Sequence, residues 1–375
     1  MPGSYNPLMA APYDICIRGA GVVGRTLALL LARDRLRVGL VETPDPAAAA
    51  DVRAYAMNAA SRELLTQLRA WPDDKQSATP VQRMEVHADD GACVRFDAQA
   101  QGQEALAWIA SAVSLQERLR EAVRYQPGIE VLSAPAEATL TVVCEGKASA
   151  TRAGLGVHYD VTRYGQHAIA ARLECELPHG QVARQWFADG EILALLPLDG
   201  PQGRAAALVW SVPQDRAGAL MALPAPEFEE RLTEASHRSL GRLTLASERA
   251  GWPLQLAKAA RWCGPGWALA GDAAHTVHPL AGQGLNLGLA DAQALAQVLH
   301  EREYWRSVGD ERLLRRYERA RKAQVVTMQL ATDGLQQLFA HDAPAWSWLR
   351  NWGMRGFERS GPLKQWATRQ AAGNL

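Results

Sequence analysis

Two glycine-rich segments of this 375-residue chain carry residue types that suit the binding of a dinucleotide. The first is the GxGxxG pattern Gly19-Ala20-Gly21-Val22-Val23-Gly24. In such a turn Gly19 permits a tight bend, Gly21 lets the backbone approach a pyrophosphate, and Gly24 allows close packing of helix on strand. Glu42 follows at the distance where a carboxylate accepts hydrogen bonds from ribose hydroxyls. An acid there favours the adenosine of FAD or NAD over the 2′-phosphate of NADP.

The second segment, Trp267–Asn286, indicates FAD rather than NAD. Asp272 follows a short apolar stretch, at the strand end where open α/β sheets bind ligands. Gly282 and Gly284 then bring bare backbone N–H groups to the start of a helix. Such a helix end can stabilise negative charge that develops on a reduced flavin ring.

These residues need a strand–helix–strand unit to position them. Asp14–Arg18 is a short extended segment, Leu27 to Leu31 have the apolar spacing of a helix, and Arg37–Glu42 is the second strand. Arg18 is either a cation near the pyrophosphate or the point where its strand reaches solvent. From Trp267 the pattern returns to α/β, with Trp267–Ala270 as a strand and a helix over 285–300.

The middle of the chain has a different pattern. Short strand candidates separated by Gly, Pro, Asp and His turns predict a mostly antiparallel sheet, with one helix at Pro226–Leu240. The strand candidates are Arg172–Leu177, Gln181–Phe187, Ile192–Pro197 and Ala205–Val212. We therefore predict an α/β (α+β overall) fold, a Rossmann-like domain with an inserted sheet domain. The predicted FAD-binding domain comprises 1–80, 104–156 and 256–340, the sheet domain 81–103 and 157–255, and a helical tail 341–375.

The stretch GDAAHTVHPLAGQGLNLGLADA, Gly271 to Ala292, closely resembles the flavin-binding signature of FAD-dependent aromatic-ring monooxygenases. The resemblance implies that Asp272 holds the ribityl chain and that Gly282–Asn286 lies along the isoalloxazine. Asp51–Ser61 looks like the arginine-containing segment of the ubiquinone-biosynthesis hydroxylases, in which Arg53 would contact FAD. The cofactor-binding residues predicted from the residues and the resemblance together are Gly19, Gly21, Gly24, Glu42, Arg53, Gln116, Gly271, Asp272, Pro279, Gly282, Gly284, Leu285 and Asn286.

Three departures from the family pattern concern the flavin domain. Glu145 stands where the family has the aspartate of an Asp-Gly motif, and the segment 130–143 is shorter than in relatives. The family's Val-Glu-Asn is replaced by Ala110-Ser111-Ala112, although Gln116 is retained. These departures favour an alternative function, an accessory subunit of a ubiquinone-biosynthesis complex that keeps the fold and has lost hydroxylation.

The leading hypothesis is a monooxygenase in which NADPH or NADH reduces FAD and a flavin hydroperoxide passes oxygen to a phenolic, polyprenylated ring. No residue is predicted as a catalytic base, because the cofactor performs the hard step. Leu195, Pro197 and Trp210 are predicted to form part of the substrate pocket wall. A further alternative is an aromatic hydroxylase of secondary metabolism; halogenation is disfavoured because no lysine-bearing halogenase motif is present.

Composition excludes several other classes. Lys+Arg and Asp+Glu both number 40, which gives no global attraction to nucleic acid. The five cysteines form no CxxC pair, so we expect no disulfide framework and a cytoplasmic location. His275 and His278 have ligand-like spacing but lack a third ligand nearby, and no metal is predicted.

The last thirty-five residues interleave tryptophans such as Trp348 and Trp352 with arginines such as Arg350 and Arg355. This pattern suits peripheral contact with the inner face of a membrane, where a prenylated substrate would reside. It equally suits a helical tail that packs on its own protein or on a partner, in a homo-oligomer or a ubiquinone-biosynthesis complex.

Overall fold

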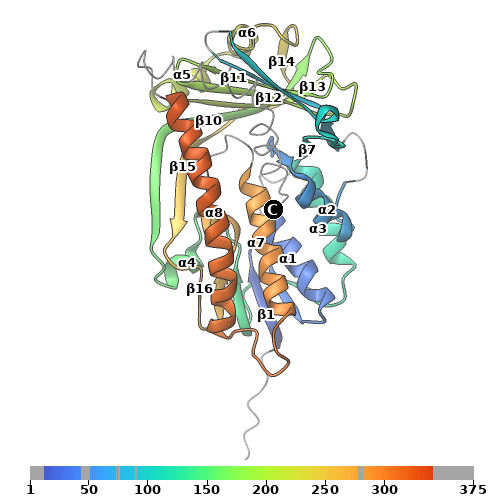
Figure 1. Ribbon diagram of the computed structural model, residues 1–375, viewed down its shortest axis with the longest axis vertical. Coiled ribbons are helices and arrows are strands. Elements are labelled where there is room, and N and C mark those ends of the chain that lie inside the picture. Colours follow the sequence, from blue (N-terminus) through green and yellow to red (C-terminus); the bar gives the residue numbers. More distant parts are fainter. Residues whose placement is uncertain are drawn as a thin grey trace, which may run out of the picture.

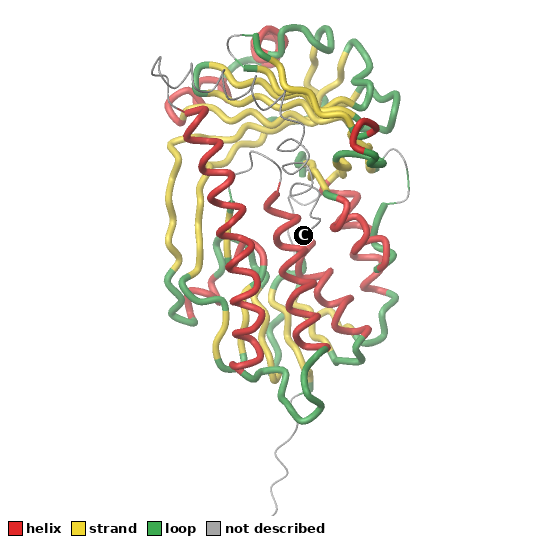
Figure 2. Tube along the Cα trace, in the orientation of Figure 1, coloured by secondary structure: helices red, strands yellow, loops and turns green. Residues whose placement is uncertain are grey.

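The computed structural model describes residues 12–43, 51–72, 74, 77–88, 91–277 and 283–340, with the backbone alone for 327–340. Within these residues, a parallel sheet covered by helices lies below a large, mostly antiparallel sheet (Figures 1 and 2). The predicted fold class is confirmed.

The parallel sheet combines strands from distant parts of the chain, in the order β16-β17-β9-β1-β2-β8. The strands are β1 (Tyr13–Arg18), β2 (Val38–Val41), β8 (Ile129–Leu132), β9 (Ala138–Val143), β16 (Cys263–Gly264) and β17 (Trp267–Leu269). Because β1 is parallel to β2 and β9, and β9 to β17, their carboxyl ends meet at one edge. The residues that follow at this edge include Gly19, Glu42, Glu145 and Gly271.

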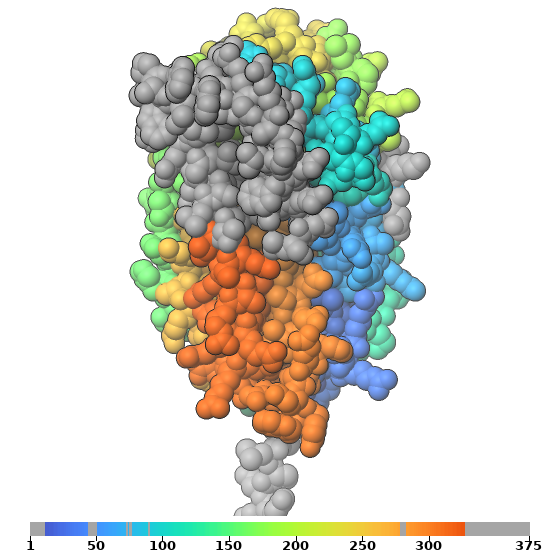
Figure 3. Space-filling model, in the orientation of Figure 1, coloured from blue at the N-terminus to red at the C-terminus, as the bar shows by residue number. Residues whose placement is uncertain are grey.

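Helices α1, α7 and α8 lie side by side over the parallel sheet, and α3 packs beside α1 (Figure 1). Their bounds are α1 (Val22–Arg33), α3 (Ala112–Arg124), α7 (Gln283–His300) and α8 (Glu311–Ala340). Ile15, Ile17 and Leu27 are fully buried in the core between sheet and helices. The outer surfaces of α7 and α8 form much of the lower half of the molecule in Figure 3, in orange. The helical apolar spacing around Leu27 thus predicted the buried face of α1 correctly.

The second sheet has the order β18-β15-β10-β13-β12-β11-β5-β6, with β14 paired to β10. Its strands are β5 (Arg83–His87), β6 (Cys93–Asp97), β10 (Tyr159–Cys175), β11 (Val182–Ala188), β12 (Glu191–Pro197), β13 (Ala205–Pro213), β14 (Leu243–Leu245), β15 (Ala250–Ala259) and β18 (His275–Thr276). Within this second sheet, β11 and β5 are the only described strands that pair in parallel. The prediction of a mostly antiparallel sheet is therefore confirmed.

β10 is much longer than the predicted strand Arg172–Leu177. It starts at Tyr159 and passes through a register shift between Arg163 and His167, where Gly165 has φ +68°. A bulge of this kind lets the strand continue through Gly165 and His167, two residue types that are common in turns. Its first half and β15 extend downward from the sheet to the nucleotide-binding layer (Figure 1). β15 continues to Ala259, past the boundary predicted at residue 255/256, and the division into domains stays a prediction.

Two helices cover the outer face of the large sheet, where one was predicted. α6 (Ala225–Ala235) matches the predicted helix and ends earlier, and α5 (Gln214–Ala222) was missed. Gly218 lies in the middle of α5 and weakens its helical signal in the sequence. Trp210, Leu220 and Phe228 belong to the core between this face and the two helices.

A small third sheet connects the layers. Its strands, in the order β3-β7-β4, are β3 (Ala54–Met57), β7 (Ala107–Ser111) and β4 (Ala78–Val81), and α2 (Ala59–Gln67) follows β3. Ile109 of β7 packs in one cluster with Ala207 of β13. This contact shows that the inner face of the large sheet, the one that carries Ala207, is turned toward the nucleotide-binding layer.

Candidate active site

In the glycine turn after β1, Gly21 has open space beside it and Gly24 has none. A Cβ atom added to Gly24 would lie 1.9 Å from the carbonyl oxygen of Gly19. One added to Gly21 would meet no protein atom within 4 Å. Gly24 therefore serves close packing of α1 on the turn, whereas Gly21 borders open space at the start of α1, where backbone N–H groups attract an anion. The turn fits a dinucleotide pyrophosphate.

This difference predicts opposite phenotypes for two alanine substitutions. Gly24→Ala should prevent folding or strongly destabilise the protein, because the new methyl overlaps backbone. Gly21→Ala should leave the melting temperature of the apoprotein within about 1 °C, since surface changes without clashes cost little, and weaken FAD binding about tenfold or more. Thermal unfolding and flavin titration measure the two effects. Unchanged FAD affinity in Gly21→Ala would show that the pyrophosphate does not approach this turn.

Glu42 directly follows β2, and its backbone N–H donates to Leu132 O at 2.9 Å. Its side chain accepts a hydrogen bond from Arg25 Nη2, with Oε1 2.5 Å away. Arg120 Nε of α3 lies 3.8 Å from the same oxygen. The carboxylate predicted to meet ribose hydroxyls is thus held by a cation of α1.

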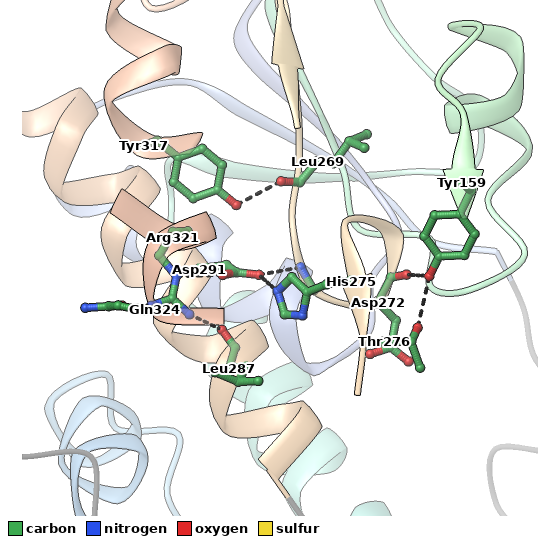
Figure 4. A network of polar contacts seen from close by, with 11 residues as sticks. Tyr159, Leu269, Asp272, His275, Thr276, Leu287, Asp291, Tyr317, Arg321 and Gln324 are labelled. Carbon is green, nitrogen blue, oxygen red and sulfur yellow. Dashed lines mark hydrogen bonds and ion pairs between the residues drawn. The ribbon is translucent and has the colours of Figure 1, made fainter. Parts of the chain in front are cut away.

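The loop after β17, Gly271 to Thr276, is held from one side by the buried carboxylate of Asp291 on α7 (Figure 4). Asp291 Oδ2 accepts the backbone N–H of Gly271 at 2.9 Å and lies 2.6 Å from His275 Nε2. Oδ1 accepts from Arg321 Nε of α8 at 2.7 Å. Because an ionised carboxylate only accepts, Nε2 carries the proton of His275. These contacts join the loop, α7 and α8 at one residue.

The charge at Asp291 is stabilised by these neighbours. Full burial by itself raises the pKa of the Asp291 carboxyl, and the charges and hydrogen bonds of His275 and Arg321 outweigh burial and lower it. Trp262 stacks on the His275 ring with centroids 4.9 Å apart. His275, which has ligand-like spacing in the sequence, is thus committed to Asp291, and no cluster of metal ligands occurs among the described residues.

The same loop is held from the opposite side by β10 and α4 (Ala150–Gly154). Tyr159 OH donates to the carbonyl oxygen of Asp272 at 2.8 Å and lies 3.0 Å from Thr276 Oγ1 (Figure 4). Arg152 Nη1 donates to Ala273 O at 3.1 Å, and its guanidinium lies 3.5 Å from the centre of the Tyr159 ring. With backbone and side chains bound on both sides, the loop is fixed before any ligand arrives.

Glu145 binds the start of α4. Its carboxylate accepts from Ser149 Oγ at 2.7 Å, from the backbone N–H of Thr151 at 3.1 Å, and from Thr151 Oγ1 at 2.5 Å. Oε1 also lies 3.1 Å from Arg18 Nε. Burial raises the pKa of Glu145, and these hydrogen bonds and Arg18 lower it overall. The longer side chain reaches both α4 and the cation at the end of β1.

The side chain of Asp272 differs from the carboxylates of Glu145 and Asp291, which each accept several hydrogen bonds. Among the described residues, none donates a hydrogen bond to its side-chain carboxylate. Loss of hydration inside the protein raises the pKa of the Asp272 carboxyl, and the charges of Lys147, His275 and Arg53 offset only part of this increase. A carboxylate in this state gains from hydroxyl donors on a ligand. The site therefore fits a polyol such as the ribityl chain of FAD.

Arg53 and Asn286 are anchored by protein groups close to this loop. Arg53 forms a two-point pair with Asp51, Nε to Oδ1 at 2.8 Å and Nη2 to Oδ2 at 2.6 Å. Arg172 of β10 donates to Arg53 O at 2.6 Å. Asn286 Nδ2 donates to Ala56 O at 2.8 Å, and its Oδ1 accepts from Asn58 N at 3.1 Å. The Asn286 side chain thus ties α7 to β3.

The other predicted contacts lie at the edges of this arrangement. Gln116 is on α3, partly buried, and Gly284 and Leu285 are in the first turn of α7. Pro279 and Gly282 lie outside the described residues. The roles of all these residues toward a cofactor stay predictions.

The residues predicted as the pocket wall, Leu195, Pro197 and Trp210, lie on the face of the large sheet that α5 and α6 cover. Leu195 and Trp210 are buried in the core under α5 and α6, and Trp210 Nε1 donates to Glu191 Oε2 at 3.0 Å. Pro197 pairs with Ala206, another residue of that core face. Sequence alternation cannot tell which of two buried faces meets the site, and a shift of one residue reverses the assignment.

Comparison with known proteins agrees with this geometry. A family model described as an FAD binding domain matches residues 133–331. The chain is 32% identical to the 3-demethoxyubiquinol 3-hydroxylase of Escherichia coli, over 96% of this chain and 99% of that protein. It is 31% identical to the ubiquinone hydroxylase UbiL of Rhodospirillum rubrum, over 96% of this chain and 90% of that protein. The chain belongs to the FAD-dependent aromatic-ring monooxygenases, in the ubiquinone-biosynthesis hydroxylase family.

The fold of this monooxygenase is also that of the p-nitrophenol 4-monooxygenase PnpA from Pseudomonas putida. That structure has a TM-score of 0.76 with 18% sequence identity, covering 97% of each chain. In the described part of the monooxygenase, no helix combines the length and the apolar character needed to cross a bilayer.

Several residues that hold the site were not found from the sequence. Arg25, Arg152, Tyr159 and Asp291 were all missed. Each of them acts through a partner that is distant in the sequence, for example 113 positions between Tyr159 and Asp272. One signal was available in the sequence of the monooxygenase. α7 is largely apolar and carries a single acid, Asp291, and an acid on the apolar side of a helix implies a charged partner inside the fold.

Proposed function

We propose that this monooxygenase hydroxylates a phenolic ring that carries a polyprenyl chain, as a step of ubiquinone biosynthesis. The observation that carries the proposal is the loop Gly271–Thr276, which is held on both sides and presents an Asp272 carboxylate to which no described residue donates a hydrogen bond. The names of the relatives, a ubiquinone hydroxylase and a 3-demethoxyubiquinol 3-hydroxylase, support the substrate class.

The residues that would hold FAD come from four strand ends. The backbone at Gly21 would face the pyrophosphate, Glu42 the adenosine ribose and Asp272 the ribityl chain, with Arg53 nearby. When bound, FAD supplies the redox chemistry that inserts one atom of O₂ into the ring with electrons from NADH or NADPH. The protein's part is to orient the ring and to exclude water.

The inner face of the large sheet is suited to an uncharged ring with an apolar chain. In antiparallel pairs, directly opposed residues share a face. Ala168 of β10 opposes Ser211 of β13, and Ala170 opposes Val209. These four residues share the inner face with Ala207, and their side chains are uncharged. We propose this face as the pocket wall in place of the residues predicted from the sequence.

Hydroxylation is tested by supplying the FAD-loaded protein with NADH or NADPH, ¹⁸O₂ and a short-chain prenylphenol. The expected product is the ring carrying one ¹⁸O atom, detected by mass spectrometry. A protein that binds and reduces flavin without labelling any phenol would contradict the substrate class. A protein that binds no flavin would instead favour the accessory-subunit function.

The position of the pocket wall is tested by Val209→Phe. The added ring should fill the inner face and lower kcat/KM for the prenylphenol at least about tenfold, while FAD affinity stays that of the wild type because Val209 lies on the sheet and not on the flavin loop. Val161→Phe is a matched control, since Val161 is 43% exposed on the same sheet in the lower half of β10. Equal kcat/KM in Val209→Phe and wild type would place the substrate elsewhere.

The predicted role of the tail in membrane or partner contact concerns residues 341–375, which lie outside the described residues. Peripheral membrane association and homo-oligomerisation stay predictions for this chain.

A further inference from the structure

Arg25 is a buried cation in the first turn of α1, directly after the glycine turn. Only 2% of its surface is exposed, and Nη2 contacts Glu42 Oε1 at 2.5 Å. Glu42, by contrast, is about one-third open, with 30% of its side chain exposed. The pair thus links an enclosed guanidinium to a carboxylate that still faces outward at the carboxyl edge of the parallel sheet.

Burial makes this contact obligatory. Removing a guanidinium from water is costly unless a counter-charge compensates, and burial lowers the pKa of Arg25 while the charge of Glu42 raises it. The backbone of Glu42 is fixed as well, by its N–H bond to Leu132. A long acidic side chain at a strand end would otherwise sample several rotamers, and ordering it would oppose ligand binding.

The contact leaves part of the carboxylate available. Arg25 and the more distant Arg120 both approach Oε1, and no described residue donates a hydrogen bond to Oε2 of Glu42. Arg120 is 53% exposed and therefore adds a weaker, screened interaction. One oxygen is thus committed to the protein and the other is presented at the place where a dinucleotide fold puts the adenosine ribose.

We propose that Arg25 is a positioning residue for the adenosine half of FAD, which holds Glu42 in the rotamer that accepts the ribose hydroxyls. The inference rests on the proposed binding of FAD. Arg25 itself touches no ligand; it acts through Glu42. Its removal therefore changes affinity for the adenosine half. The hydrogen bonds of the flavin loop to Asp291, Tyr159 and Arg152 do not involve Arg25 and stay as they are.

The test is a double-mutant cycle with Arg25→Met, Glu42→Gln and the double variant, each titrated as apoprotein with FAD by quenching of flavin fluorescence. Arg25→Met should weaken FAD binding about tenfold, the loss expected for one charge-assisted hydrogen bond. If Arg25 acts through Glu42, the double variant is no weaker than the weaker single variant. ADP, as a competitor of FAD, should lose affinity by the same factor, and Arg25→Lys should recover part of the loss.

Arg184→Met is the matched control, because Arg184 is also largely buried and pairs with Glu85 at 3.4 Å, on the large sheet. It should lower the melting temperature without changing FAD affinity. Arg25→Met with wild-type FAD affinity, or fully additive losses in the double variant, would overturn the positioning role. If Arg25→Met does not fold, the uncharged variant Arg25→Gln with wild-type FAD and ADP affinities would overturn it equally. If the wild type binds no FAD, the cofactor assignment itself fails, and the role of Arg25 with it.

Discussion

Asp291→Asn is expected to destabilise the folded protein by about 3–5 kcal/mol, the usual cost of leaving a buried charge without its partner. The substitution keeps the shape of the side chain but removes the charge that compensates Arg321, and it replaces one acceptor oxygen with a donor amide. Asp291 accepts from Gly271, His275 and Arg321, so all three contacts are affected together. Urea unfolding of the apoprotein measures the change.

Asp34→Asn is the control for this prediction. Asp34 also accepts from a histidine, His300 at the end of the same helix α7, but the His300 side chain is 67% exposed. The free energy of unfolding should change by less than about 1 kcal/mol, as for other exposed pairs. Similar losses in Asp34→Asn and Asp291→Asn would contradict the view that the buried carboxylate joins the flavin loop to α7 and α8.

The pH dependence of this effect follows from the sign of the shift. The pKa of Asp291 is lowered in the folded state, so its charge contributes stability above the unfolded pKa of about 4 and loses it as pH falls through the folded pKa. The difference in stability between wild type and Asp291→Asn should therefore be largest near neutral pH. It should shrink below about pH 4.

Asp272→Asn should have opposite effects on stability and on cofactor binding. FAD affinity should fall roughly 10- to 100-fold, because a charged acceptor for ligand hydroxyls is replaced by a neutral amide. The apoprotein should become more stable, with a melting temperature higher by about 1–2 °C. In the wild type, the pKa of Asp272 is raised in the folded state, so the ionised carboxylate lowers the stability above the unfolded pKa. Protonation of Asp272 at lower pH removes this loss of stability.

Thermal unfolding of the two apoproteins at several pH values and FAD titration measure both effects. The gap in melting temperature between Asp272→Asn and wild type should close as the pH falls toward 4, where Asp272 becomes protonated. A variant that is less stable than the wild type and binds FAD equally well would show that Asp272 serves the fold and not the ligand.

Much of the nucleotide-binding half could be predicted because its signals are local. The turn Gly19–Gly24, the helix that follows and the strand after Trp267 depend on residues within a few positions of each other. The mostly antiparallel pairing of the large sheet was predicted, whereas the length of β10 and the orientation of the two faces of the sheet were not. The bulge at Gly165 made β10 look shorter than it is, and two buried faces made Trp210 look like a pocket residue.

The residues that hold the site rigid could not be predicted in the same way. Asp291 meets Arg321 across two helices, and Arg152 reaches Ala273 across 121 positions. Such pairs depend on the tertiary arrangement alone. From the sequence, Glu145 suggested a weakened cofactor site. In the structure its carboxylate contacts both Thr151 and Arg18.

The most direct test of the central claim is the visible absorption spectrum of the purified protein before and after addition of FAD. We predict a bound flavin whose absorption near 450 nm is lost on addition of NADH or NADPH without oxygen and restored by O₂, as is usual for flavoprotein monooxygenases. A protein that retains no flavin even at high FAD concentration would contradict the assignment of the Gly19–Gly24 turn and the Gly271–Thr276 loop as the cofactor site.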